Sequence, residues 1–402
     1  MHPSQSVQPE AHVSEEHVVN KTLDSINERI RKGKAVVLTA EEMTKAVSEM
    51  GKVEAAKEVD VVTTGTFSPM CSSGMLFNIG QRGESMRVSQ MTVNDVPAYA
   101  GIAAVDCYLG ATETSLDDPL NKVYPGEFKY GGGHVIEDLV RGRSVHITAS
   151  SYGTDCYPRR SLELDVTLED LPFAQLLNPR NGYQNYNVAV NLDDKIIYTY
   201  MGPLKPGVRN ANFATAGCLS PLFNDPLFKT IGLGTKIFLG GGVGWVLGPG
   251  TQHNPSPPRT ERGVPTRPAG TMMVRGEMKN MDGRFLRGVS MLGYGCSLAV
   301  GLGVPIPVLN EEIAWYTGVS DEDIIMPVKD YGEDYPKGSP RVLAEVSYAD
   351  LKSGQIELMG KKVQTVPMTS YMLSLEVAET LKSWILEKGF TLTAPQELLP
   401  SS

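Results

Sequence analysis

Hydrophobic residues recur with helical spacing near the start of the chain. Leu23, Ile26 and Ile30 repeat every three to four positions, and Gly33 follows where the glycine after a helix belongs. This spacing predicts a first helix that ends before Gly33. The residues ahead of it are polar and show no such period, so residues 1–20 are predicted to form a flexible tail.

The next segments alternate between strand and helix patterns. A short strand at residues 36–37 is followed by Thr39 and Glu42, which match a capping box at the start of a helix. That helix is predicted to end at Gly51. The β-branched run at residues 59–64 is continuous, as in a strand covered on both faces. Alternation of this kind predicts an α/β fold.

Glycine and proline interrupt the rest of the chain more often. The middle holds glycine runs at residues 131–133 and 240–244, which predict short elements. A proline-rich stretch at residues 253–268 predicts a surface loop, with a lid over a site as the alternative. Residues 345–363 predict strands with a hairpin, and the final amphipathic helix ends at Gly389.

These elements together predict one large α/β domain with mixed sheet layers, flanking helices and one or two lobes. We place this catalytic domain at residues 21–393, because neither repeats nor a linker composition interrupt that span. Residues 394–402 are then a C-terminal tail. A chain of 402 residues with 41% hydrophobic and 21% charged residues is sufficient for a substantial core.

Charge and hydropathy disfavour two classes of partner. The net charge of −9 and the pI of about 5.3 are atypical of proteins that bind nucleic acids or anionic membranes, which carry basic surfaces. No run reaches the ~20 apolar residues of a spanning helix, and the start of the chain lacks the regions of a secretory signal. We expect a soluble, cytoplasmic protein.

Familiar cofactor motifs are absent from the sequence. It contains no GxGxxG, P-loop, GxSxG or HExxH pattern, and the Gly293-Tyr294-Gly295 sequence lacks the third glycine of a dinucleotide motif. Its five cysteines lie at least 36 positions apart, without the spacing of a zinc or iron–sulfur site. We therefore expect no metal and no bound cofactor on this chain, which leaves thiol chemistry.

Two cysteines are distinguished by their neighbours. Cys71 is predicted to lie between a strand and a helix, whose N-terminus would favour a thiolate, and a packed thiol in a turn is the alternative. Cys156 is followed by Arg159 and Arg160, which are candidates to stabilise its thiolate or to bind a substrate carboxylate. The other three have apolar or glycine neighbours and are predicted to be packed thiols: Cys107, Cys218 and Cys296.

Histidines and glycines supply the remaining candidates. His134 and His253 both follow glycine-containing segments and are candidates for proton transfer to a departing oxygen. The backbone amides of Gly241 and Gly242 are candidates for binding a carboxylate. The alternatives are structural histidines and a tight turn.

Several segments together resemble the homocysteine-biosynthesis family, in the form without the CBS-domain pair that longer members add. The similarity extends from about Lys21 to Thr393. It rests on residues 26–30, 39–43, 67–74, 132–139, 151–158, 237–244 and 305–311. The family occurs mainly in methanogens and anaerobic bacteria, and its activity is that of an L-aspartate semialdehyde sulfurtransferase. The resemblance implies that Cys71 and Cys156 are the two functional cysteines.

The resemblance also implies a reaction, the formation of L-homocysteine for methionine biosynthesis. Exchange of the aldehyde oxygen for sulfur, with a two-electron reduction, requires a sulfide or persulfide donor and a reductant. We expect one cysteine to carry a persulfide and the other to resolve it, which brings the Cα atoms of Cys71 and Cys156 to about 4.4–6.8 Å. A small ferredoxin-like iron–sulfur protein is the implied electron donor, and association between copies of the chain is left open.

Two other functions are compatible with the sequence. An acyl-transferase or CoA-transferase-like enzyme also combines α/β lobes with glycine-rich loops, and it would form an acyl intermediate. A non-catalytic sulfur-carrier subunit would hold a persulfide on Cys71 without a substrate pocket. Labelling by acyl-CoA, or sulfur acceptance without binding of aspartate semialdehyde, distinguishes these functions from a sulfurtransferase.

Overall fold

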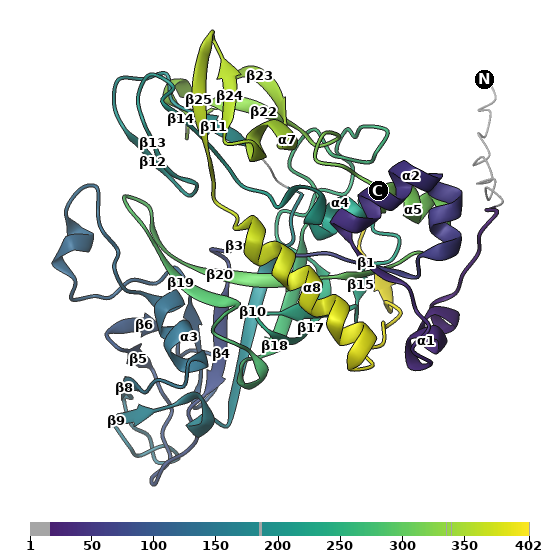
Figure 1. Cartoon of the computed structure of the whole chain (residues 1–402). Helices are drawn as coiled ribbons and strands as arrows, with labels where there is room; N and C mark the ends of the chain where they lie inside the picture. The colour runs from purple at the N-terminus through teal and green to yellow at the C-terminus, as the bar shows by residue number, and fades with distance from the viewer. Residues whose placement is uncertain (1–16, 185–186, 335, 339, 402) are drawn as a thin grey trace, which may run out of the picture.

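Three sheets of four or more strands follow one another along the molecule, with the largest in the middle (Figure 1). The computed structural model describes residues 17–401 apart from 185, 186, 335 and 339. Helices flank the sheets, and parallel and antiparallel pairing both occur. The predicted α/β class with mixed sheets is therefore confirmed. No helix of the described part is long and apolar enough to span a membrane.

The central sheet has nine strands, and all of its pairings are antiparallel. Helix α8 packs against β3 and β20, and helix α3 packs against β19 and β20. The strands, in spatial order, are β19 (Leu286–Met291), β20 (Gly295–Gly303), β16 (Lys236–Leu239), β17 (Gly242–Pro249), β18 (Met272–Glu277), β10 (Phe173–Asn181), β4 (Gly74–Asn78) and β7 (Asp106–Gly110), with β3 (Thr66–Pro69) paired to β20; the helices are α3 (Gly132–Val140) and α8 (Tyr371–Glu387).

A six-stranded mixed sheet lies at one end of the central sheet (Figure 1). It has its own buried apolar cluster, and the two-stranded hairpin β12–β13 lies beside it. The predicted C-terminal hairpin is confirmed as β24 and β25. The strands are β23 (Val342–Ser347), β22 (Ile325–Asp330), β11 (Val188–Val190), β14 (Asn210–Phe213), β25 (Lys361–Pro367) and β24 (Gln355–Leu358), and the hairpin joins β12 (Ile197–Thr199) to β13 (Gly202–Leu204).

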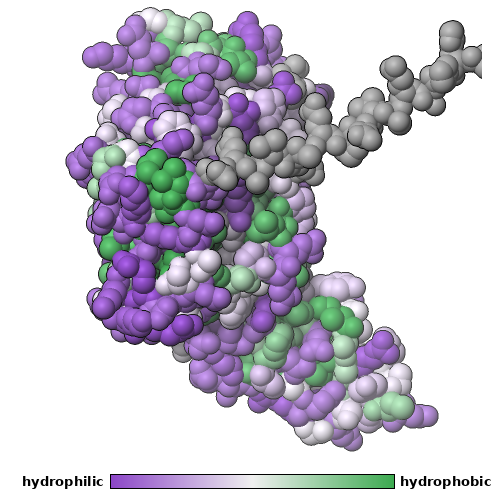
Figure 2. All heavy atoms as spheres, turned by 90° about the vertical axis from the view of Figure 1, so that its right-hand side faces the viewer, coloured by the Kyte–Doolittle hydropathy of each residue, from purple (hydrophilic) through white to green (hydrophobic). Residues whose placement is uncertain are grey.

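A four-stranded antiparallel sheet lies at the other end. It appears at the lower left of Figure 1, and Figure 2 shows this lower part of the molecule projecting from the body. The face in Figure 2 is mainly hydrophilic, with hydrophobic residues in separate groups. The strands, in spatial order, are β6 (Val96–Ala98), β5 (Gln90–Val93), β8 (Val145–Ser150) and β9 (Ser161–Val166).

The N-terminal helices begin where the sequence predicts. Helix α1 (Leu23–Arg31) ends before Gly33, and helix α2 (Ala40–Glu58) begins with the predicted reciprocal bonds between Thr39 and Glu42. Gly51 interrupts α2 with a φ of 78°, but the helix resumes and continues to Glu58. The predicted end of this helix is therefore a kink, because a positive φ at glycine breaks one turn without preventing the next.

Shorter elements complete the fold around these helices. Strands β1 (Val37–Thr39), β2 (Val61–Thr63) and β21 (Pro305–Pro307) form a small sheet that confirms the two predicted N-terminal strands. The remaining helices are α4 (Pro221–Asn224), α5 (Glu311–Thr317), α6 (Tyr331–Asp334) and α7 (Tyr348–Lys352).

Both predicted tails are shorter than expected. Residues 1–16 lie outside the described part, but the backbone amides of Val18 and Val19 bond the Glu311 carboxylate. At the other end, β26 (Glu397–Leu398) pairs with β15 (Gly232–Leu233), and Leu399 belongs to the core. The predicted tail at residues 394–402 was wrong for these residues, because a two-residue pairing and one buried leucine leave no periodic signal in the sequence.

The packing of the C-terminal segment is testable with two adjacent leucines. Leu399 is 2% exposed and Leu398 is 47% exposed. We expect Leu399→Ala to lower the free energy of unfolding by about 2–5 kcal/mol, because it leaves a cavity in the core. Leu398→Ala is the matched control and should change stability by less than about 0.5 kcal/mol. Denaturant unfolding checks both, and equal effects would contradict the packed C-terminus.

Candidate active site

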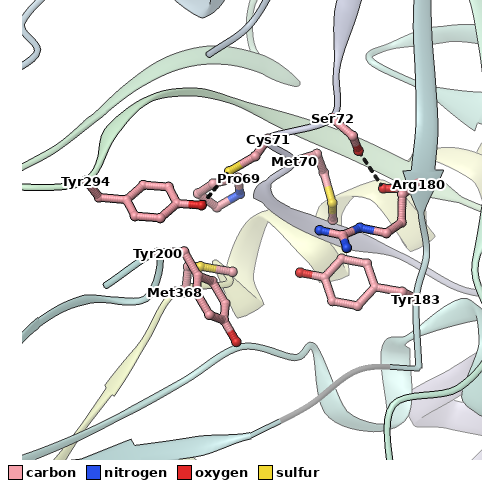
Figure 3. Close-up of a pocket in the computed structure, with 9 residues that line it drawn as sticks. All are labelled: Pro69, Met70, Cys71, Ser72, Arg180, Tyr183, Tyr200, Tyr294 and Met368. Carbon is pink, nitrogen blue, oxygen red and sulfur yellow. Dashed lines mark hydrogen bonds between the residues drawn. The ribbon is translucent and has the colours of Figure 1, made fainter. Parts of the chain in front are cut away.

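A cavity of about 210 Å³ lies among turns that leave the central sheet and segments that approach from the six-stranded sheet. Figure 3 shows nine residues that line it: Pro69, Met70, Cys71, Ser72, Arg180, Tyr183, Tyr200, Tyr294 and Met368. The first four come from the end of β3 and the turn that follows it, and Tyr294 comes from the β19–β20 turn. The cavity holds one thiol, one cation and three phenols.

The pairing of β3 with β20 sets the position of Cys71. Pro69 is opposite Ala299, and the Met70 amide donates to the Leu298 carbonyl at 2.8 Å, so Cys71 lies beside Ser297. The Ser73 amide then donates back to the Met70 carbonyl at 3.0 Å and closes a turn. Cys71 is thus held at the point where the chain leaves one strand for the next.

A buried asparagine fixes this turn from the other side. The Asn178 amide nitrogen donates to Ser73 Oγ at 2.8 Å, and its oxygen accepts from Ser72 Oγ at 3.1 Å and from the Arg180 amide at 3.0 Å. Because all three partners belong to the two segments that meet at the cavity, Asn178 couples the position of Cys71 to that of Arg180.

The segment after Cys71 is strand β4, not the predicted helix. Its residues Met75 and Phe77 are buried while Leu76 is half-buried, and the strand pairs with both β10 and β7. A run of three apolar residues, Met75 to Phe77, fits either element, and long-range pairing makes it a strand. No helix dipole therefore acts on Cys71 from this side.

Two hydroxyl groups, instead of the expected amides of a helix N-terminus, contact the sulfur of Cys71. Ser297 Oγ donates to Cys71 Sγ at 3.4 Å, and the hydroxyl of Tyr294 lies 3.8 Å from the same sulfur, toward which it points in Figure 3. Both groups can donate to an anionic sulfur, either a thiolate or the terminal atom of a persulfide. The geometry therefore suits a sulfur nucleophile that carries negative charge.

Arg180 supplies the positive charge of the cavity. Its guanidinium bonds the side-chain oxygen of Gln252 and lies 5.7 Å from the ring of Tyr183, and it forms no ion pair with a carboxylate of the described residues. Burial raises the pKa of the Tyr183 hydroxyl, so this phenol is neutral at physiological pH. A guanidinium without a carboxylate partner in the described part of the chain, next to a neutral phenol, suits the binding of a carboxylate.

Comparison with known proteins identifies the family. The profile described as "Homocysteine biosynthesis enzyme, sulfur-incorporation" matches residues 35–392. The chain belongs to this family of enzymes. Its relatives include proteins named L-aspartate semialdehyde sulfurtransferase from Methanocaldococcus jannaschii, 47% identical over 94% of this chain, and from Methanosarcina acetivorans, 45% identical over 95%; the match covers 72% of each relative. No solved structure matches the chain.

The family assignment confirms the resemblance found in the sequence and makes the arrangement of its cysteines informative. Cys107, Cys218 and Cys296 are buried, as predicted. Burial raises the pKa of Cys107 to about 12 and that of Cys296 to about 11, and it raises the pKa of Cys218 as well. These thiols stay protonated near neutral pH and are poor nucleophiles.

Cys156 lies apart from the cavity. It is exposed at the tip of the β8–β9 hairpin, in a turn closed by bonds between Thr154 and Tyr157. In the same loop, the backbone amide of Arg159 donates to the carbonyl of Ser85. Ser85 follows the Asn78 end of β4, whereas Cys71 precedes the Gly74 end, and β4 alone spans roughly 13 Å. The expected approach of the two Cα atoms to disulfide distance is therefore wrong for this conformation of a single chain.

The other predicted binding residues also lie outside the cavity lining. Arg159 bonds backbone carbonyls, and Arg160 is exposed on the same hairpin. His134 contacts Ser290 and stacks on Tyr130, and burial lowers its pKa. His253 is held between the backbone of Thr271 and the carbonyl of Pro400. Their positions favour the structural alternatives.

The glycine run at 240–244 is a tight turn. Leu239 is opposite Gly242, so residues 240 and 241 form a two-residue hairpin loop, and both have positive φ. A Cβ on Gly241 would lie 2.9 Å from the Asp282 amide nitrogen. The glycines are therefore required by backbone conformation and close packing, and neither Gly241 nor Gly242 lines the cavity.

Sequence reasoning missed the polar residues around Cys71. Tyr294 stands between two glycines that drew attention only as an incomplete dinucleotide motif, although an aromatic residue between glycines in a turn is itself a signal. Arg180 and Ser297 have no local pattern that marks them. The described residues contain no group of three or more His, Cys, Asp or Glu side chains placed to hold a metal ion.

Thiol accessibility can be tested by alkylation. At pH 8 we expect iodoacetamide to label Cys71 and Cys156 in the native protein, because the three buried thiols have raised pKa values and remain protonated. Peptide mapping by mass spectrometry checks the sites, and unfolded protein is the control in which all five cysteines react. Labelling of native Cys107 as fast as Cys156 would contradict the structure.

Proposed function

We propose that this protein is an L-aspartate semialdehyde sulfurtransferase that forms L-homocysteine. The names of the two relatives support this activity. The observation that carries it is the cavity itself, in which the half-buried thiol of Cys71 and the guanidinium of Arg180 share one small space. A substrate with an aldehyde at one end and a carboxylate at the other matches these two groups.

The proposed binding mode places the substrate aldehyde at Cys71 and its carboxylate at Arg180. Tyr183 and Tyr200 line the space between, where their hydroxyl oxygens can accept from the substrate ammonium. Tyr294 lies beside the sulfur and is the group best placed to donate a proton toward the aldehyde oxygen. These assignments replace Arg159, Arg160, His134 and His253.

The overall conversion combines an aldehyde, hydrosulfide, two electrons and three protons into a thiol and one water. In the proposed first step the terminal sulfur of a Cys71 persulfide forms a bond to the aldehyde carbon, and the carbonyl electron pair moves to oxygen, which takes a proton. A second thiolate then attacks the Cys71 sulfur, breaks its S–S bond and leaves Cys71 in a disulfide. The released hydroxythiol loses water, and two electrons and two protons reduce the resulting thioaldehyde.

The second thiol is not part of the cavity, whose lining contains one cysteine. The resemblance implies Cys156 for this role. Because Cys156 is exposed on a hairpin, it can reach Cys71 of another copy of the chain, or Cys71 of its own chain after displacement of the loop. A protein partner is the third route. We propose that the electrons come from an external iron–sulfur protein of the ferredoxin type.

Cavity composition favours this function over the two alternatives. The lining contains no glutamate or aspartate to form an acyl intermediate, as an acyl-transferase or CoA-transferase-like enzyme would require. It contains a cation and three phenols, whereas a sulfur-carrier subunit needs only an accessible thiol. Sulfur acceptance and substrate binding are therefore expected in the same protein.

Cysteine substitutions test the reaction. With aspartate semialdehyde, sulfide and a low-potential reductant under anaerobic conditions, we expect Cys71→Ala to abolish homocysteine formation. Cys156→Ala should lose multiple turnover, with partial recovery when a small thiol is added, because Cys71 still carries sulfur. Cys107→Ala is the control and should remain active. Homocysteine formation by Cys71→Ala would disprove the assignment.

Arginine substitutions test the binding mode. We expect Arg180→Gln to raise the KM for aspartate semialdehyde about tenfold or more, because a charged hydrogen bond contributes about 1.5–3 kcal/mol. Arg180→Lys should recover part of the loss, since it keeps the charge but not the bidentate geometry. Arg160→Gln, on the exposed hairpin, is the control. Steady-state kinetics check the set, and equal KM values for Arg180→Gln and Arg160→Gln would exclude the carboxylate site.

A further inference from the structure

A second, smaller chamber adjoins the Cys71 cavity. It has a volume of about 30 Å³ and shares Met70 and Tyr183 with the larger space. Besides Tyr183, five serine and threonine side chains contribute to its wall: Thr66, Ser68, Thr215, Ser220 and Thr369. Figure 3 shows Met70 and Tyr183 among the residues that line the larger cavity.

Strand β3 forms one wall of the chamber. Thr66, Ser68 and Met70 are alternate residues of this strand and its continuation, so they project to the same side. The same segment then continues to Cys71 in the larger cavity. One extended segment therefore presents hydroxyl groups to the chamber and the reactive thiol to the substrate space.

Three of these hydroxyl groups have no hydrogen-bond partner among the described residues. They belong to Thr66, Ser68 and Thr369, which are only 7%, 3% and 4% exposed. By contrast, Thr215 and Ser220 bond each other and nearby backbone amides. These three hydroxyls are open to the chamber, so water or another small polar species inside it can hydrogen-bond to them.

The chamber is too small for an amino acid. A water molecule needs about 10–15 Å³ of such volume, so the space admits two waters or one slightly larger monatomic centre. Hydrosulfide is a single sulfur atom with one proton, and it accepts hydrogen bonds from hydroxyl groups. Its low charge density makes neutral hydroxyls, rather than a guanidinium, suitable partners.

We propose that the chamber formed by Thr66, Ser68 and Thr369 is the binding site for inorganic sulfide, which supplies the sulfur to Cys71. This inference rests on the proposed sulfurtransferase function. The organic substrate and the sulfur donor then occupy two adjoining spaces, separated by the flexible side chain of Met70 and by Tyr183.

The transfer step balances without an added oxidant. After each turnover Cys71 is in a disulfide with the second thiol, as described above. Hydrosulfide attacks the Cys71 sulfur of that disulfide, an S–S bond forms to give the persulfide, and the second thiol leaves as a thiolate. Sulfide is oxidised as the disulfide is reduced, and the released thiolate is the one that later resolves the substrate adduct.

Kinetics of isosteric variants test the site in the full-length protein. Thr369→Val keeps the shape but removes the hydroxyl, whereas Thr369→Ser keeps the hydroxyl. We expect Thr369→Val to raise the KM for sulfide about tenfold, with a much smaller change in the KM for aspartate semialdehyde, and Thr369→Ser to retain most of the affinity. Ser68→Ala should act in the same direction. Equal sulfide KM values for Thr369→Val and Thr369→Ser would overturn the proposal.

A crystallographic measurement gives a result that is independent of activity. Anaerobic crystals of the reduced protein, treated with sodium hydroselenide as a heavier analogue, should show a selenium anomalous peak in the chamber that is lost in Thr369→Val. Ordered water alone in the chamber would refute the sulfide site. A selenium peak without homocysteine formation by the wild type would instead retain the site and reject the proposed overall reaction.

Discussion

Antiparallel pairing of β3 with β20 is the constraint on which the site depends. It aligns a short strand with the fully buried β20 and brings Ser297 to Cys71, 226 positions away in the sequence. Alternation along β3 then directs its hydroxyl residues to one side, and the turn that follows exposes the thiol. Helix α8 packs over the same strands. A shift of register by one residue would reverse these faces, so the sheet core and the chemistry are fixed together.

Burial and polar contacts distinguish the five cysteines. Three are buried, where desolvation favours the neutral thiol, and one projects into solvent on a hairpin. Cys71 alone combines partial burial, two nearby hydroxyls and a cavity with a cation. The candidate position is thus distinguished by what surrounds the sulfur, whereas the three buried cysteines belong to the packed interior.

The two adjoining spaces suit the proposed reaction, with an organic aldehyde in the larger and an inorganic sulfur species in the smaller. The aldehyde substrate carries a fixed charge that an arginine can hold, whereas hydrosulfide offers only one atom to recognise. A shared boundary of Met70 and Tyr183 keeps the two spaces apart while leaving them adjacent. Asn178 bonds the two serines that follow Cys71 and the Arg180 backbone, and so keeps Arg180 in register with the thiol.

Local signals in the sequence determined the helices α1 and α2, the capping box of Thr39, the C-terminal hairpin and the prominence of Cys71, because these depend on residues a few positions apart. The polar neighbours of Cys71 and the separation of Cys156 were decided by the tertiary structure. Arg180, Tyr294 and Ser297 lie far along the chain, and only strand pairing brings them together. The sequence by itself determined the family and made Cys71 the leading candidate thiol; long-range sheet register decided which side chains face it, since no local pattern encodes contacts across more than one hundred positions.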